Sequence, residues 1–180
     1  MTLLECLVVM LLLVIMVGVS SNLAAWIARH RLITFQHDVY RSLMVARHHA
    51  INYGVDVVVC PLGNDGGCAM PSGNWSNGWR VFETEGEQDC QPKTGGLCHH
   101  GGRILVEQAP VRKGFHIAVN SHLARRARFD AMGMSHGYNG RLTVCSRQNV
   151  TPLGLVIAQS GRVRKAEPEE LLPCDAGSTP

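Results

Sequence analysis

Residues 1–28 read MTLLECLVVMLLLVIMVGVSSNLAAWIA, and this stretch decides the fold. Residues 6–28 carry no charged side chain, and about 20 apolar residues suffice for one helix to cross a bilayer. A cleavable signal peptide fits less well, because no basic segment precedes the apolar run and the run exceeds the usual length of about 7–15 residues. The pattern therefore predicts a helix that crosses a membrane once.

A single acidic residue, Glu5, stands at the front edge of this apolar run. A carboxylate near the interior of a bilayer costs on the order of 3 kcal/mol, so a simple membrane anchor leaves Glu5 unexplained. We therefore expect Glu5 to pair with a group of opposite charge.

Behind the apolar run, the helix is expected to continue with one apolar face. Apolar side chains recur there at steps of three and four, and Gly54 follows as a stop signal. These side chains are Leu32, Phe35, Val39, Leu43, Ala46, Ala50 and Tyr53. One helix over residues 1–53 would be about 80 Å long at ~1.5 Å per residue. We thus divide the chain into a transmembrane and assembly half of the helix (residues 1–28), an amphipathic half (29–54) and a globular domain (55–180).

The globular domain is predicted to consist of short strands in antiparallel sheets, which makes the fold class α+β. Asn77-Gly78 and Asn139-Gly140 are strong turn signals. The chain has 19 glycines but only three Trp, three Tyr and four Phe, which favours strands and turns over a helical bundle. The expected strands cover residues 55–60, 78–83, 103–108, 115–120, 126–131, 141–146, 153–159 and 162–165.

Seven cysteines are present, and six of them lie outside the apolar run. An even number there indicates disulfides formed in an oxidising compartment such as the periplasm. Six cysteines allow fifteen pairings, and their spacing alone does not choose among them. Cys-x-x-Cys does not occur, and the adjacent histidines of His48-His49 and His99-His100 would point apart on a helix or a strand, so we expect no metal and no cofactor.

Thr2-Leu3-Leu4-Glu5 followed by an apolar helix resembles the start of a mature type IV pilin or pseudopilin. The resemblance implies that prepilin peptidase cuts off a leader, that Met1 is then methylated, and that Glu5 pairs with the N-terminal amine of a neighbouring subunit. The family usually has Phe where this chain has Met1. The arginines that follow the apolar run, taken alone, place the domain on the cytoplasmic side, because positively charged residues flank a membrane span on that side. A basic leader before Met1 would carry positive charge at the other end of the span and so allow a periplasmic domain.

Motifs farther along the chain narrow this resemblance to the GspH/FimT-type minor pilins, and in particular to FimT-like members. The most specific are Trp75-x-x-Gly78-Trp79-x-Val81-Phe82 and Gly161-Arg162-Val163-Arg164. The resemblance implies the type IV pilin fold, in which a long N-terminal helix packs on two small antiparallel sheets. It also implies a single-pass protein of the bacterial inner membrane, with its C-terminal domain in the periplasm. Such a protein joins other major and minor pilins in a pilus, at or near the tip.

Three disulfides are predicted for this domain. Cys60–Cys68 and Cys145–Cys174 each join the end of an expected strand to a nearby loop or tail, and Cys90–Cys98 follows by elimination. A disulfide of this kind contributes roughly 2–4 kcal/mol by restricting the unfolded chain.

Gly161-Arg162-Val163-Arg164 resembles the motif by which FimT-like pilins of transformable bacteria bind DNA. Residues two apart on a strand share a face, so Arg162 and Arg164 would present two guanidinium groups side by side, with Lys165 on the flank. Arginine pairs well with phosphate, and a few such contacts give weak, salt-sensitive binding to double-stranded DNA of any sequence. The alternative interpretation is that these charges lie on an edge strand and only prevent it from pairing with the sheet of another molecule.

Two further features modify the DNA hypothesis. Arg126 and Arg128 would also share a strand face and extend the DNA-binding surface, unless they form an ordinary solvated face. The three glutamates of the sequence Glu167-Pro168-Glu169-Glu170 follow the motif closely, and their charge opposes a phosphate backbone.

The sequence contains no motif of an enzyme: neither Gly-x-Ser-x-Gly, nor His-Glu-x-x-His, nor a phosphate-binding loop occurs. We therefore expect no enzymatic activity. The leading hypothesis is a minor pilin that binds extracellular DNA for uptake in natural transformation. The alternative is a minor pilin that primes or caps pilus assembly, or a pseudopilin of type II secretion, that acts through protein contacts alone.

Overall fold

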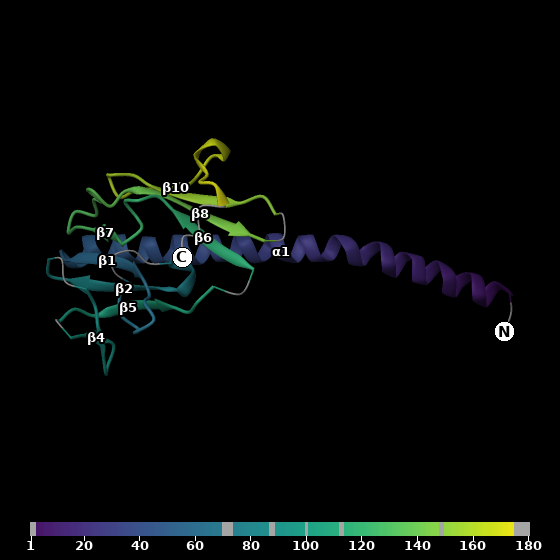
Figure 1. Ribbon diagram of the computed structural model, residues 1–180, viewed down its shortest axis with the longest axis horizontal. Helices are drawn as coiled ribbons and strands as arrows, with labels where there is room; N and C mark the ends of the chain where they lie inside the picture. Colours follow the sequence, from purple (N-terminus) through teal and green to yellow (C-terminus); the bar gives the residue numbers. More distant parts are fainter. Residues whose placement is uncertain are drawn as a thin grey trace.

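The computed structural model describes residues 3–69, 74–86, 89–99, 101–111, 114–147 and 150–174, but not the side chains of residues 16–22 and 24. One continuous helix, α1 (Leu3–Tyr53), runs out of a globular domain (Figure 1). The helix ends as predicted at Gly54, which has a φ of 66° and donates its N–H to the carbonyl of Ala50 over 2.9 Å. A positive φ is readily adopted by glycine, so the stop is encoded locally.

The first part of α1 extends away from the domain, and its apolar side chains are exposed. Leu3 is 84% exposed and Leu11 59%, and the side chains of residues 3–15 are exposed all round the helix. In the described part of the chain, no helix is both long and apolar enough to cross a membrane. This finding differs from the span predicted for residues 1–28, a stretch that includes residues 1 and 2 and several side chains outside the described set.

The second half of α1 packs on the domain through the stripe predicted from the sequence, except that Tyr53, at the end of the helix, is 65% exposed. Its buried apolar residues follow one another at steps of three, four and seven, as expected for one face of a helix. Gln36 lies on the same face and donates from Nε2 to the carbonyl of Gly154 over 2.8 Å, which ties the helix to a strand. The buried apolar residues are Ala28, Leu32, Val39, Leu43, Ala46 and Ala50.

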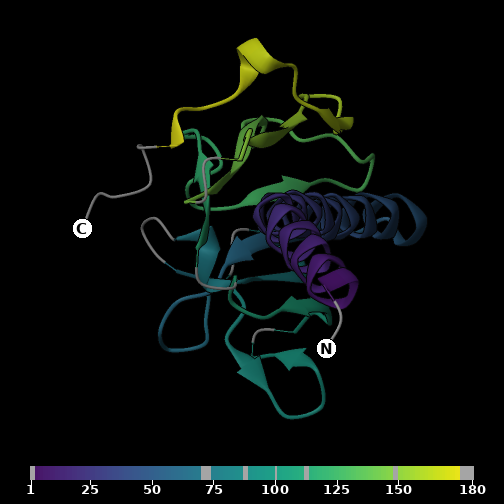
Figure 2. The same ribbon diagram turned by 90° about the vertical axis from the view of Figure 1, so that its right-hand side faces the viewer.

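Two four-stranded antiparallel sheets, built from described residues, flank this half of the helix. The first sheet has the order β5 (Ile104–Gln108), β2 (Trp79–Thr84), β1 (Asp56–Pro61), β7 (Ala127–Phe129). The second sheet has the order β10 (Val163–Lys165), β9 (Leu153–Ile157), β8 (Gly140–Ser146), β6 (Phe115–Val119). The second sheet lies above α1 and the first below it in both views (Figures 1 and 2). The α+β pilin fold predicted from the sequence is confirmed.

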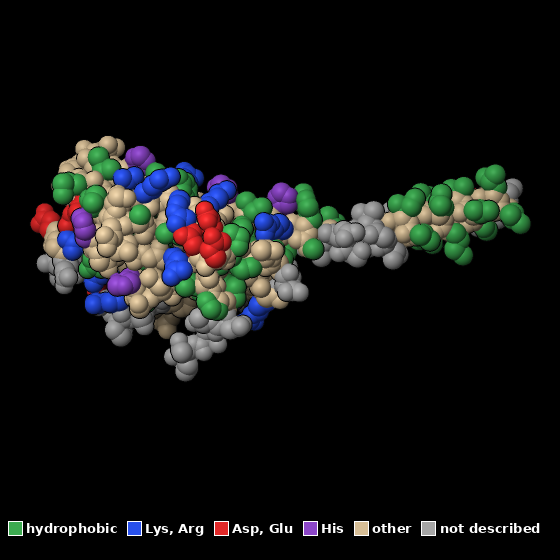
Figure 3. All heavy atoms as spheres, turned by 90° about the horizontal axis from the view of Figure 1, so that it is seen from above, with side chains coloured by type: hydrophobic (Ala, Val, Ile, Leu, Met, Phe, Trp, Pro, Cys, Tyr) green, Lys and Arg blue, Asp and Glu red, His purple; other side chains and the backbone are tan. Residues whose placement is uncertain are grey.

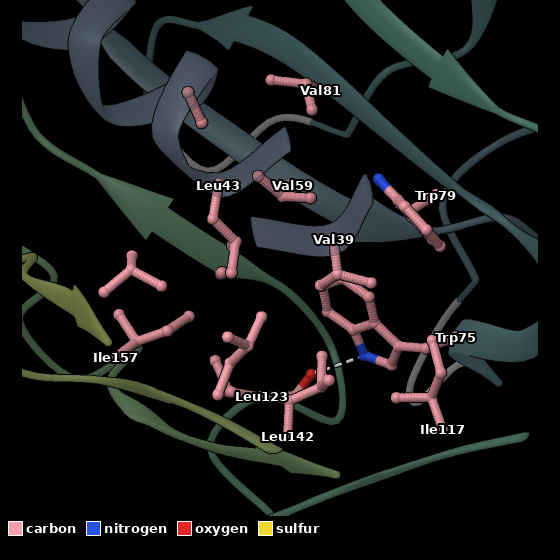
Figure 4. Close-up of a cluster of buried hydrophobic side chains, with 14 of the residues drawn as sticks. Val39, Leu43, Val59, Trp75, Trp79, Val81, Ile117, Leu123, Leu142 and Ile157 are labelled. Carbon is pink, nitrogen blue, oxygen red and sulfur yellow. Dashed lines mark hydrogen bonds between the residues drawn. The ribbon is translucent and has the colours of Figure 1, made fainter. Parts of the chain in front are cut away.

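One hydrophobic core joins the helix to both sheets (Figure 4). Val39 and Leu43 come from α1, whereas Leu142 comes from the second sheet. Trp75 lies at the edge of this core, and its indole Nε1 donates to the carbonyl of Leu123 over 2.9 Å. Because the sheets share one core with the helix, the second half of α1 and the domain form a single packed unit.

The outer face of each sheet is covered by segments that disulfides hold in place. On the first sheet, Val58 and Phe82 turn away from α1 and pack in a second buried cluster with the Cys60–Cys68 and Cys90–Cys98 disulfides. On the second sheet, the buried Cys145 is joined to the tail in the Cys145–Cys174 disulfide. These three pairs are the ones predicted from the sequence. Both faces of β1 are therefore covered, so side chains that point to either face are buried, which explains why β1 is apolar almost throughout.

Several short elements lie in stretches that the sequence pattern predicted as loop or tail. β3 (Pro92–Lys93) and β4 (Leu97–Cys98) form a small antiparallel ribbon. The described residues also include two 3-10 helices, η1 (Trp75–Asn77) and η2 (Pro168–Glu170). Strands of two residues and single 3-10 turns show no period of their own, so the sequence pattern did not reveal these elements.

Candidate functional site

The predicted basic motif lies on the last hairpin of the domain, formed by β9 and β10. Val163 is opposite Ile157 and only 7% exposed, because it faces the core. Arg162 and Arg164, on either side of it, are exposed. Alternation along an extended chain thus places the two arginines on the same outer face, as the sequence predicts. Lys165 is exposed as well.

The turn that precedes β10 is held close to the helix. Gly161 has a φ of 72°, and a Cβ atom there would lie 1.8 Å from the carbonyl oxygen of Gly133, so no other residue fits. Arg47 of α1 donates from Nε to the same Gly133 oxygen over 3.1 Å and from Nη2 to the carbonyl of Ser160 over 3.3 Å. The hairpin therefore presents Arg162 from a fixed position.

Arg164 is occupied by an intramolecular carboxylate. Its Nη2 and Nη1 atoms lie 2.5 and 2.6 Å from the two carboxylate oxygens of Glu170, a bidentate ion pair. The same carboxylate accepts the N–H of Glu167 over 2.9 Å and closes a capping box around η2. By contrast, the side chains of Arg162 and Lys165 make no hydrogen bond or ion pair with any other residue that the structure describes.

The ion pair keeps Glu170 charged at all ordinary pH values. The hydrogen bonds from Arg164 and then from the Glu167 backbone lower the pKa of Glu170 from its ordinary 4.5 to about 2. Because this pKa is lowered, the ion pair contributes its full stabilisation of the fold above about pH 4.5. That stabilisation is lost only as the pH falls toward 2. Acidification within the physiological range therefore does not free Arg164.

A third arginine, which was not predicted from the sequence, belongs to this surface. Arg141 of β8 and Arg164 of β10 both pair with Val156 of β9, so the two arginines flank Val156 on one face of the second sheet. Arg141 is exposed, and its Nη1 atom lies 3.5 Å from the backbone carbonyl of Glu170. Only the cross-strand register brings these residues together, and a single sequence gives no direct signal of register.

Figure 3 views this face from above, with an acidic cluster at its centre and Lys and Arg side chains around it. The cluster belongs to the η2 turn, which carries Glu167, Glu169 and Glu170. We call Arg141, Arg162 and Arg164 the arginine face, and Lys165 is exposed beside it at the end of β10. The arginine face is a basic surface with an acidic turn built into it.

Arg126 and Arg128 do not extend this surface, which corrects the role assigned to them. Arg126 is only 5% exposed, and its Nη2 atom lies 3.3 Å from the carboxylate of Asp89. Arg128 is half-buried on β7 and forms an ion pair with Asp56 that raises the pKa of its guanidinium. Both arginines neutralise acids of their own domain, so neither is presented to a phosphate backbone.

The remaining predicted residues are placed as follows. Glu5 is exposed in the first turn of α1, among exposed apolar side chains. Met1 lies outside the described residues. Among those residues, one trio could offer atoms to a metal, His116 with Cys145 and Cys174, but the two cysteines are joined as a disulfide and His116 Nε2 lies 2.6 Å from the carbonyl oxygen of Cys174.

A long, solvent-extended helix that packs by its second half on two antiparallel sheets defines a protein of the pilin class. The family of the Type II transport protein GspH matches residues 36–161, more than half of the chain. The chain therefore belongs to the GspH family, and it is a GspH/FimT-type minor pilin or pseudopilin.

Solved structures agree on the fold. The type IV minor pilin FimU of Pseudomonas aeruginosa is 15% identical, with a TM-score of 0.55 over 78% of this chain and 92% of that chain. The minor pseudopilin EpsH from the type 2 secretion system of Vibrio cholerae is 13% identical, with a TM-score of 0.51 over 78% of this chain and 99% of that chain. A comparison with curated protein sequences found no match.

Proposed function

We propose that this minor pilin binds double-stranded DNA without sequence preference through Arg162, Arg164 and Lys165, and that it serves DNA uptake in natural transformation. The observation that carries the proposal is a pair of exposed arginines, Arg162 directly before edge strand β10 and Arg164 within it. The Arg162 side chain has no polar partner among the described residues. Guanidinium groups in a row suit the regular spacing of phosphates. The proposal gives the protein no enzymatic role.

The test is a titration of the full chain, in neutral detergent, against unrelated duplex DNA. Two to three phosphate contacts give a salt slope of about 1.8–2.7, so raising the salt from about 50 to about 200 mM should weaken binding about 10- to 40-fold. Arg162→Gln combined with Arg164→Gln should weaken binding at the lower salt concentration by at least about tenfold.

The matched control is Arg31→Gln combined with Arg41→Gln, which removes the same charge from two positions on α1. This control should change the affinity by less than about twofold. An equal loss in both double variants would indicate a general charge effect and contradict the proposal. Absence of binding by the unaltered chain would favour the alternative, a minor pilin that primes or caps assembly or a secretion pseudopilin.

Assembly is a separate proposal, supported by the exposed apolar side chains of residues 3–15. The pilin family implies membrane-anchored components that assemble with other pilins. We propose that this chain resides in the bacterial inner membrane, with its domain in the periplasm, until it joins a pilus at or near the tip. We further propose that prepilin peptidase exposes Met1 for methylation, and that Glu5 then pairs with the amine of a neighbouring subunit.

Glu5→Ala is expected to leave the amount of protein in the membrane fraction unchanged and to reduce its incorporation into filaments at least about tenfold. The reason is that an unpaired positive charge in an apolar environment is as costly as an unpaired carboxylate. Immunoblots of membranes and of sheared filaments measure both quantities. Leu7→Ala, an exposed position on the same helix, is the control for a change of shape alone. Normal incorporation of Glu5→Ala would contradict the role of Glu5.

A further inference from the structure

We propose that the Glu170 carboxylate occupies the position of a DNA phosphate on the arginine face until DNA binds and a phosphate replaces it. Arg141 is then an additional phosphate ligand, once Glu170 has moved away. This inference rests on the proposed DNA binding and adds a residue and a form of regulation to it. The acidic turn would then set the affinity for DNA rather than abolish it.

The geometry of the ion pair is that of a bound anion. Two oxygens of Glu170 meet two nitrogens of Arg164 at 2.5 and 2.6 Å, an arrangement that a phosphate adopts with arginine equally well. The strand register places Arg141 on the far side of Val156, on the same face. A phosphate in the position of the Glu170 carboxylate would therefore lie against Arg164 and within the positive field of Arg141.

The turn that carries Glu170 is fastened at both ends by hydrogen bonds of its backbone. Before it, the N–H of Ala166 donates to the carbonyl of Gly154 over 3.0 Å, and after it, the N–H of Leu172 donates to Thr143 Oγ1 over 2.8 Å. Between these ends, the polar contacts that hold it to described residues of the sheet are the exposed ones of Glu170 with Arg164 and Arg141. Between these two points η2 stands out from the second sheet in both ribbon views (Figures 1 and 2). Glu170 can therefore leave Arg164 without release of the tail.

The strength of the contact also suits displacement. An ion pair this exposed changes an equilibrium by no more than about fivefold, because water and salt screen it. Polyanionic DNA, which offers several phosphates at once, can replace such a carboxylate. A buried pair of the kind made by Arg126 could not be opened in this way.

The experiment compares Glu170→Gln with Glu169→Gln in the duplex titration described above. Both variants remove one negative charge from η2, but of the two glutamates only Glu170 forms an ion pair with a described arginine. The amide oxygen of the introduced glutamine can still accept the N–H of Glu167, so the turn keeps its cap. Thermal melts of each variant establish that the fold is retained.

Glu170→Gln should tighten binding about three- to fivefold at an unchanged salt slope, because the same phosphates are bound in both chains, whereas Glu169→Gln should stay within about twofold. Arg141→Gln should lower the affinity about threefold both in the unaltered chain and in the Glu170→Gln background, because a phosphate has replaced Glu170 in both bound states.

The outcomes separate this inference from the proposed function. Equal affinities for Glu170→Gln and Glu169→Gln would overturn the inference, while DNA binding that depends on Arg162 and Arg164 would still stand. An effect of Arg141→Gln below about twofold in either background would overturn the role of Arg141. If neither the unaltered chain nor Glu170→Gln binds duplex DNA, the proposed function fails and the inference fails with it.

Discussion

Trp75→Ala is expected to lower the free energy of unfolding by about 3–5 kcal/mol, a large part of the about 5–15 kcal/mol that stabilises a typical domain. Trp75 is 1% exposed and belongs to the core shared by the helix and both sheets. Loss of the indole leaves a cavity and also deprives the buried carbonyl of Leu123 of its 2.9 Å hydrogen bond. Denaturant titration followed by circular dichroism measures the loss.

Two companion variants make this prediction specific. Trp26→Ala removes the same side chain from a position that is 59% exposed, and should change the free energy of unfolding by no more than about 0.5 kcal/mol. Trp75→Phe keeps an aromatic ring but removes the N–H donor, and should fall between the other two. If Trp75→Ala and Trp26→Ala gave similar values, the assigned core would be wrong.

The architecture could be predicted because its signals are periodic and local. The stripe of apolar residues on α1 repeats at helical spacing over several turns, and Gly54 ends it by its own backbone preference. The strands of the domain are short, but turn residues bound most of them, and each strand of the two large sheets overlaps a predicted range. The small ribbon of β3 and β4 was missed because two-residue strands have no pattern.

The candidate site could be predicted only in part, because charge partners are set by the tertiary fold. Alternation along the chain was enough to place Arg162 and Arg164 on one face. It could not show that β1 brings Asp56 against Arg128, 72 residues away, which removes that arginine from the surface. Nor could it show that Arg141 lies two strands away from Arg164, since the register of three strands decides their proximity.

The ion pair of Glu170 is another charge contact that the sequence could not reveal. From the sequence, the three glutamates behind the motif act only as a general repulsion against phosphate. In the structure one of them, Glu170, is placed on Arg164 by the capping box of η2, whereas Glu169 forms no ion pair with a described residue. A local hydrogen-bond pattern thus converts a diffuse charge effect into a specific contact between two residues.

Removal of the Cys145–Cys174 disulfide, by Cys145→Ala combined with Cys174→Ala, is expected to lower the free energy of unfolding by about 3.5 kcal/mol. The two cysteines are 29 residues apart, and a cross-link across a loop of that length strongly restricts the unfolded chain. The contact between His116 Nε2 and the backbone carbonyl of residue 174, at 2.6 Å, does not involve the sulfur atoms, so the double variant can keep it. Thermal and denaturant unfolding of the oxidised protein measure the change.

Cys60→Ala combined with Cys68→Ala is the matched control, because that disulfide closes a loop of 8 residues and should contribute only about 2.5 kcal/mol. The two variants should also differ in DNA binding. Cys145–Cys174 fastens the end of the tail that carries Glu170, so its loss should loosen η2 and raise the affinity for duplex DNA, but by less than Glu170→Gln does, because the hydrogen bond of Leu172 to Thr143 still holds the chain behind η2. Cys60–Cys68 lies on the first sheet, and its loss should leave the affinity unchanged. An affinity that rises equally in both variants would show that loosening of the domain, rather than release of Glu170, exposes the arginines.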